Sequence, residues 1–76
     1  MIRFTNHALL KLAQRKILRE LVEETVTHPD YMFETYGGRR VVYKKFGDRF
    51  LKVVITEEIG TTNIVTQHWD STFTPK

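Results

Sequence analysis

Apolar residues in the first third of the chain recur at spacings of three and four, which is the period of a helix with one buried side. The first set is Ala8, Leu9, Leu12 and Ala13. The second set is Ile17, Leu18, Leu21, Val22, Thr25 and Val26. The pattern predicts helical structure over residues 6–27, divided into two helices by a bend near Arg15–Ile17.

Both ends of this helical region carry recognisable signals. Thr5 or Asn6 can cap the first helix, because a short side-chain oxygen accepts a hydrogen bond from an unpaired amide of the first turn. His28-Pro29 ends the second helix, because proline disfavours helical geometry in the residue before it.

After Pro29 the chain changes to short runs typical of β-strands, separated by turn residues. The runs are Tyr31–Tyr36, Arg39–Phe46, Arg49–Glu57 and Thr62–Trp69. Gly37-Gly38 and Gly47-Asp48 suit two-residue hairpin loops, since glycine readily adopts positive φ angles, and a looser turn surrounds Ile59–Thr61. The predicted fold is α+β: two helices packed on a four-stranded antiparallel meander of order ααββββ, with strands over about 31–69.

The tight turns also predict which side chains share a face of the sheet. A two-residue loop at Gly47-Asp48 sets Val42 opposite Val53, and the first hairpin sets Phe33 opposite Val42. The face predicted to receive the helices is Phe33, Val42, Phe46, Leu51, Val53 and Ile55. The other face is Met32, Val41, Tyr43, Lys45, Phe50, Lys52 and Val54.

Nothing further is predicted to cover the second face, because the polar tail 70–76 is expected to fray or to dock at an edge. A one-residue bulge would exchange the two faces beyond it.

Composition restricts the class of protein. A chain of 76 residues suffices for one small domain, residues 1–76, with a modest core. The absence of cysteine excludes disulfides, thiolate zinc sites and cysteine catalysis. No apolar run reaches the roughly 18 residues of a membrane span, and the N-terminus lacks the apolar stretch of a signal peptide. We therefore expect a soluble, cytoplasmic domain that does not associate with a membrane.

The net charge of +3 is concentrated in one part of the chain. Residues 39–52 hold six of the twelve basic residues and one of the nine acidic residues, a local charge of +5 against −2 elsewhere. Tyr43, Phe46 and Phe50 lie among these cations, and such a mixture is typical of single-stranded nucleic-acid binders. Two other interpretations stay open: a solvated sheet face whose lysines prevent association, and a surface for an acidic protein.

Histidines are the principal candidates for chemistry. His7 lies in the first helical turn, where the helix dipole disfavours the imidazolium, and His68 ends the last strand. For both, an ordinary structural or polar role is the commoner one, and His28 is expected only to contact the last helical carbonyls. Because the histidines lack metal-ligand spacing and no phosphate loop or dinucleotide motif is present, we predict no metal and no cofactor.

One reaction class fits the remaining groups. Metal-independent RNA cleavage requires a base, an acid and cations around the phosphate, all of which His, Tyr, Lys and Arg supply on a shallow surface. The sequence permits this reaction without requiring it.

The chain also resembles, to about residue 68, a small family of uncharacterised bacterial and archaeal domains allied in fold to the RelE/ParE toxins. The matching segments are Thr5-Asn6-His7-Ala8, Arg15-Lys16-Ile17, Val22-Glu23-Glu24, His28-Pro29-Asp30, Gly37-Gly38-Arg39-Arg40-Val41-Val42-Tyr43-Lys44, Gly47-Asp48-Arg49 and Leu51-Lys52-Val53-Val54-Ile55.

This resemblance implies the toxin of a toxin–antitoxin pair, with ribonuclease activity and with RNA and an antitoxin protein as partners. His7, Arg15 and His68 match positions that are characteristic of such domains. The chain departs from the pattern at Lys16, where glycine is usual, and at Leu18, where a serine or threonine cap is usual.

Together these observations predict a RelE-like ribonuclease, with a non-catalytic module for nucleic acid or an acidic protein as the alternative. The expected catalytic residues are His7 or His68 as general acid or base, and Tyr43 as a polar or stacking contact. The expected phosphate ligands are Arg15, Lys45, Arg49 and Lys52.

Overall fold

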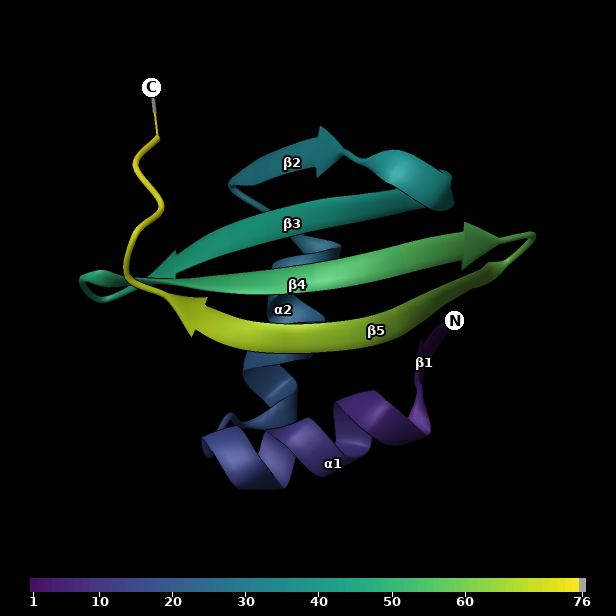
Figure 1. Ribbon diagram of the computed structural model, residues 1–76, viewed down its shortest axis with the longest axis horizontal. Coiled ribbons are helices and arrows are strands. Elements are labelled where there is room, and N and C mark those ends of the chain that lie inside the picture. The colour runs from purple at the N-terminus through teal and green to yellow at the C-terminus, as the bar shows by residue number, and fades with distance from the viewer. Residues whose placement is uncertain (76) are drawn as a thin grey trace.

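The computed structural model describes residues 1–75 and has a mixed α+β fold in which all strands belong to a single sheet (Figure 1). The elements are β1 (Ile2–Phe4), α1 (Asn6–Arg15), α2 (Arg19–Thr27), β2 (Tyr31–Glu34), the 3-10 turn η1 (Tyr36–Gly38), β3 (Arg39–Phe46), β4 (Arg49–Glu58) and β5 (Thr61–Asp70). The sheet has five strands in the order β1-β5-β4-β3-β2. Both helices pack on one face, α1 mainly against β5 and α2 against β4 and β3.

The prediction of two helices is confirmed, and the break between them has a local cause. The Thr5 hydroxyl caps α1 by accepting a hydrogen bond from the Ala8 amide at 3.1 Å. Lys16 ends α1 in the left-handed conformation, with φ 53° and ψ 48°. This conformation costs a non-glycine residue about 1 kcal/mol, which explains why glycine suits the position better. Leu18 begins α2 without a side-chain cap hydrogen bond.

The predicted four-stranded antiparallel meander is corrected by an additional strand. β1 pairs in parallel with β5, Ile2 beside Thr62 and Phe4 beside Ile64. The sheet is therefore mixed, with a parallel pair at one edge. A strand of three residues is too short to show an alternating pattern, and its partner lies at the other end of the chain.

The predicted register is correct for one hairpin and wrong for the other. Val42 lies opposite Val53 across β3 and β4, as the Gly47-Asp48 loop requires. In β2, however, Met32 rather than Phe33 lies opposite Val42. Residues 35–38, with η1 among them, connect β2 to β3 in place of a two-residue loop. This shift by one residue moves Phe33 to the face opposite the helices.

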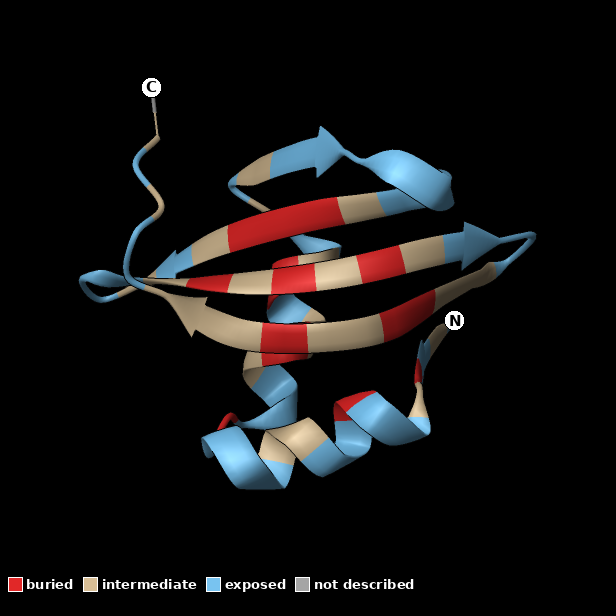
Figure 2. Cartoon of the chain, in the orientation of Figure 1, coloured by how far each residue is buried: buried red, intermediate tan, exposed pale blue. Residues whose placement is uncertain are grey.

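The core lies between the helices and the sheet (Figure 2). Its members are Phe4, Ala8, Ile17, Val22, Val42, Leu51, Val53, Ile55 and Ile64. Burial of each large aliphatic side chain contributes about 1.5–3 kcal/mol, so these residues supply most of the stabilisation of a chain this small. The pairing of β4 with β5 shifts its register between Val54 and Ile55. This shift allows both Ile64 and the buried Gln67 to face the helices.

The sheet face opposite the helices, here called the open face, is partly covered by the C-terminal tail. The Phe73 ring stacks on Tyr43 with 3.7 Å between centroids, and it makes edge contacts with Tyr31, Phe33 and Phe50. The Asp70 carboxylate accepts hydrogen bonds from the backbone of Thr72 and Phe73 and so turns the chain back. The prediction of a frayed or edge-docked tail and an uncovered second face is therefore wrong.

Candidate functional site

The open face brings together polar residues from three neighbouring strands. Lys52 of β4 lies between Tyr43 of β3 and His68 of β5 in the strand register. Arg15 approaches from the last turn of α1 at the outer edge of β5, where its Nη1 donates to the Gln67 carbonyl at 2.7 Å and to the Thr66 hydroxyl at 3.3 Å. We call Arg15, Tyr43, Lys52, His68 and Asp70 the His68 cluster.

His68 is the residue of this cluster best suited to accept a proton. Burial lowers the pKa of its imidazole below the ordinary value of 6.5, and the charges of Lys52 and Arg15 lower it further. Asp70 acts in the opposite direction, as the smallest of the four influences. The imidazole is therefore predominantly neutral at pH 7, with two cations close to it.

Tyr43 has a different environment although it lies in the same row. Its side chain is buried beneath Phe73, and its hydroxyl donates to Asp70 Oδ2 at 3.5 Å. Burial first, and then the Asp70 carboxylate, raise the pKa of the Tyr43 phenol. Its ring already stacks with Phe73, so a base could stack on it only after the tail had moved.

Asp70 connects the cluster to the tail. Its Oδ1 accepts hydrogen bonds from the Thr72 hydroxyl at 2.7 Å, the Thr72 amide at 2.9 Å and the Phe73 amide at 3.1 Å. The bonds from Thr72 are the main reason that the pKa of Asp70 is lowered. Sequence reasoning missed Asp70 and Phe73; the segment Asp70-Ser71-Thr72 is typical of an Asx turn and could have indicated the reversal of the chain.

Three predicted site residues lie apart from the cluster. His7 is exposed in the first turn of α1, and within residues 1–75 no polar contact joins it to His68 or Tyr43. Arg49 lies on the side of β4 that faces the helices, with its guanidinium 4.0 Å from the centroid of Trp69. Lys45 is exposed on the open face of β3.

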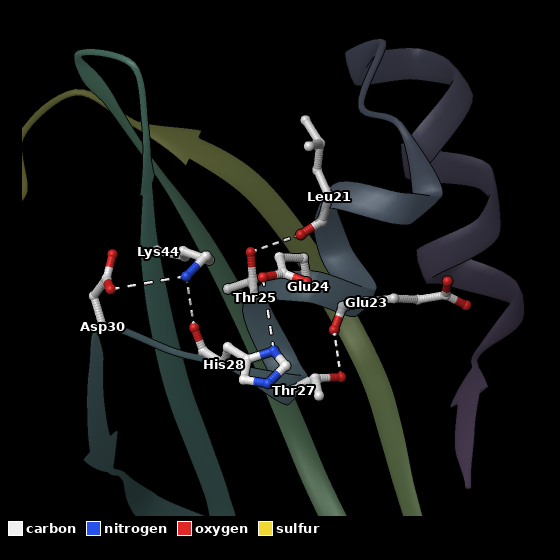
Figure 3. Close-up of polar contacts among 8 residues, drawn as sticks. All are labelled: Leu21, Glu23, Glu24, Thr25, Thr27, His28, Asp30 and Lys44. Atoms are coloured by element: carbon white, nitrogen blue, oxygen red, sulfur yellow. Dashed lines mark hydrogen bonds and ion pairs between the residues drawn. The ribbon is translucent and has the colours of Figure 1, made fainter.

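The basic residues of the β3–β4 hairpin also have separate roles. Lys44 donates from Nζ to the His28 carbonyl at 2.9 Å and lies 3.8 Å from the Asp30 carboxylate, so it connects the end of α2 to the start of β2 (Figure 3). Arg40 pairs with Glu57 at 2.7 Å. For the part of the chain that the structure describes, Arg39, Lys45 and Lys52 have no ion-pair partner.

Two kinds of feature are absent from residues 1–75. No group of three or more histidine and carboxylate side chains among them could hold a metal ion. None of their helices is long and apolar enough to cross a membrane.

Comparison with known families identifies the class of the chain. Residues 4–66 match the family described as a domain of unknown function, DUF4258. Because the match covers most of the sequence, the chain belongs to this family. No curated protein and no solved structure matches the chain.

The match agrees with the expectation of an uncharacterised family, whereas the relation to RelE/ParE toxins stays a prediction. The matched segment contains Arg15, Tyr43 and Lys52 and ends before His68 and Phe73.

Proposed function

We propose that the protein binds single-stranded RNA on the open face of its sheet and cleaves it without a metal ion. The observation that supports this proposal is the position of His68, a half-buried residue of β5 beside Lys52, where burial and then the charges of Lys52 and Arg15 lower the pKa of its imidazole. A neutral base beside two cations is suited to a substrate in which a hydroxyl lies next to a phosphate.

In the proposed reaction, His68 accepts the proton of a ribose 2′-hydroxyl, and the 2′ oxygen attacks the adjacent phosphorus. Lys52 and Arg15 stabilise the negative charge that grows on the phosphate oxygens. The bond to the 5′ oxygen breaks, and the Lys52 ammonium beside His68 donates a proton to that oxygen. The products are a 2′,3′-cyclic phosphate and a 5′-hydroxyl. This assignment selects His68 over His7 as the base.

A cleavage assay with purified protein tests the proposal. Single-stranded RNA is incubated with the wild type in the presence of EDTA, and its fragments are examined for 2′,3′-cyclic phosphate ends. His68→Ala is expected to lower the rate at least about 100-fold, since a general base contributes about 10²–10⁴. His7→Ala is the matched control and is expected to retain the wild-type rate. Intact RNA with the wild type, or loss of activity with His7→Ala alone, would contradict the proposal.

The toxin role rests on the sequence resemblance, so it has a separate test. Expression of the wild type is expected to arrest the growth of a sensitive host, and His68→Ala is expected to be tolerated. Co-expression of a short neighbouring reading frame, which would encode the antitoxin, is expected to restore growth. Equal tolerance of the wild type and the variant would contradict the toxin role.

A non-catalytic binding module is the second candidate. The observation that favours it is that Lys45 and Lys52 both lie on the open face without ion-pair partners in the described chain. In this case RNA or an acidic polypeptide binds and stays intact. Lys45→Glu and Lys52→Glu are expected to weaken binding strongly, whereas Lys11→Glu, the same charge change on α1, has little effect.

A further inference from the structure

The two edges of the sheet differ in how their backbone groups are satisfied. At the β5 edge, β1 pairs with Thr62–Ile64, the Thr5 hydroxyl donates to the Val65 carbonyl and Arg15 donates to the Gln67 carbonyl. At the β2 edge the outer backbone groups have no hydrogen bond among residues 1–75. β2 is therefore the edge at which another strand can be added (Figure 1).

The hydrogen bonds between β2 and β3 show which backbone groups point outward. The Thr35 amide donates to the Arg39 carbonyl at 2.9 Å, which makes these two residues a hydrogen-bonded pair. Such pairs alternate along an antiparallel ladder, so Phe33 also exchanges hydrogen bonds with its partner on β3. The N–H and C=O groups of Met32 and Glu34 consequently point away from the sheet.

Of the features that usually prevent strand addition, β2 has a short length and one charged residue, Glu34, but it carries no lysine, no proline and no bulge. Met32 is 54% exposed and Phe33 is 48% exposed. On the open face an apolar groove runs beside β2, lined by Tyr31, Phe33, Phe73, Thr74 and Pro75.

We propose that β2 pairs antiparallel with β2 of a second copy of this chain, so that the two sheets become continuous around a two-fold axis at Phe33. In this register Met32 lies opposite Glu34 of the second copy, and both present outward donors and acceptors that can pair. Tyr31 lies opposite Thr35 of the second copy. The two Phe33 side chains meet at the axis, each at the mouth of the other copy's groove.

Charge favours this register over the antiparallel register centred on Met32. An antiparallel pairing centred on Met32 would place Glu34 opposite Asp30 of the second copy, and like charges in opposite positions destabilise a sheet. In the proposed register the two acidic residues do not meet. Glu34 also has Arg40 of its own chain at 4.0 Å, which reduces the cost of holding its carboxylate at the interface. In this register the strand pairs with its own copy without opposed like charges and with the exposed apolar residues Met32 and Phe33 at the contact, which favours a second copy as the occupant.

Disulfide trapping tests the register directly, because the chain contains no cysteine. Opposite residues of a non-hydrogen-bonded antiparallel pair have Cα atoms about 4.5 Å apart, which is within the range that a disulfide can bridge. Phe33→Cys is therefore expected to form covalent dimers about tenfold faster than Tyr36→Cys, an even more exposed control at 97%. Met32→Cys should resemble the control, since it lies opposite Glu34.

Sedimentation equilibrium tests the dimer without a cross-link. The wild type is expected to reach twice the mass of one chain as its concentration rises. Met32→Pro removes an outward N–H and no bond to β3, so it is expected to shift the equilibrium to the monomer while circular dichroism stays unchanged; Met32→Leu is the control. A wild type that stays monomeric over its soluble range, with equal cross-linking of Phe33→Cys and Tyr36→Cys, would overturn the proposal. Binding of only a heterologous strand at β2 would also overturn it.

Discussion

The two faces of the central sheet are built from alternate residues of the same strands, yet they perform different tasks. Val42 and Val53 face the helices and are almost completely buried, whereas their neighbours Tyr43 and Lys52 face the open side. The covered face is aliphatic, and the open face combines cations, His68 and an aromatic cluster around Phe73. One strand therefore contributes to stability with one set of positions and to the candidate site with the other.

The aromatic cluster around Phe73 shows that part of the open face is buried as well. Phe73 contacts aromatic rings from β2, β3 and β4, so the tail buries part of the open face. The His68 cluster begins where this cover ends, at Tyr43 and Asp70. The tail thus both stabilises the sheet and borders the proposed RNA site.

The largest expected difference separates adjacent valines of β4. Val53→Ala removes two methyl groups from the core and is expected to lower the free energy of unfolding by about 2–3 kcal/mol. Val54→Ala makes the same change on the half-buried open side and is expected to cost about 1 kcal/mol. Urea denaturation of both variants measures the difference. Equal losses would mean that the two faces are equally packed.

Removal of the Phe73 ring should have an intermediate effect on the free energy of unfolding. Phe73→Ala deletes the stacked contact with Tyr43 and the edge contacts around it, and we expect a loss of about 2 kcal/mol without unfolding of the core. Thr74→Ala, at the adjacent exposed position, is the control and should be neutral. Thermal denaturation of both proteins checks this, and identical midpoints would show that the tail does not stabilise the open face.

The Tyr43 hydroxyl is expected to contribute less to the free energy of unfolding than the Phe73 ring does. Tyr43→Phe removes a long hydrogen bond to Asp70 and should cost about 0.5 kcal/mol near neutral pH. Since the pKa of Tyr43 is raised in the fold, the folded state holds the phenolic proton more tightly than the unfolded state does. Stability should therefore fall as pH rises above 10 in the wild type, and the variant should lack this component. Denaturation curves between pH 8 and pH 11 test the sign.

The smallest expected effect on stability is that of the His68 side chain. Its pKa is lowered in the fold, so as pH falls below 6.5 the unfolded state takes up a proton before the folded state does. Stability should consequently decrease as pH falls through this range, and His68→Gln should remove that part of the decrease. NMR titration of the His68 ring is the direct check; a midpoint at or above 6.5 would contradict the proposed neutral base.

Much of the fold was predictable because local signals specify it. The helical spacing, the cap at Thr5 and the stop at His28-Pro29 define two helices. The Gly47-Asp48 turn defines the β3–β4 register, and from it the pairing of Val42 with Val53. The errors lie where a signal was ambiguous. Gly37-Gly38 fits a two-residue loop as well as a longer turn, and the longer turn moved Phe33 to the open face.

The candidate site was predictable in part for the same reason. Tyr43, Lys45 and Lys52 were correctly placed on one face, since alternation along a strand is a local property. His7 was included for its place in the first helical turn and for the family resemblance, and Arg49 for its charge, and the fold places both away from the His68 cluster. The aromatic environment of Tyr43 depends on Phe73, whose position no spacing along the chain could indicate.

The sequence by itself determined the helices, the long strands and the concentration of positive charge in residues 39–52, because each follows from neighbouring residues. Only the tertiary structure decided which contacts each of these basic side chains makes. It paired Arg40 and Lys44 with acids, turned Arg49 onto Trp69 and left Lys52 beside His68. It also brought Arg15 and β1 to one sheet edge and left β2 open at the other. These contacts join residues distant in the chain, and such pairings depend on packing rather than on local preference.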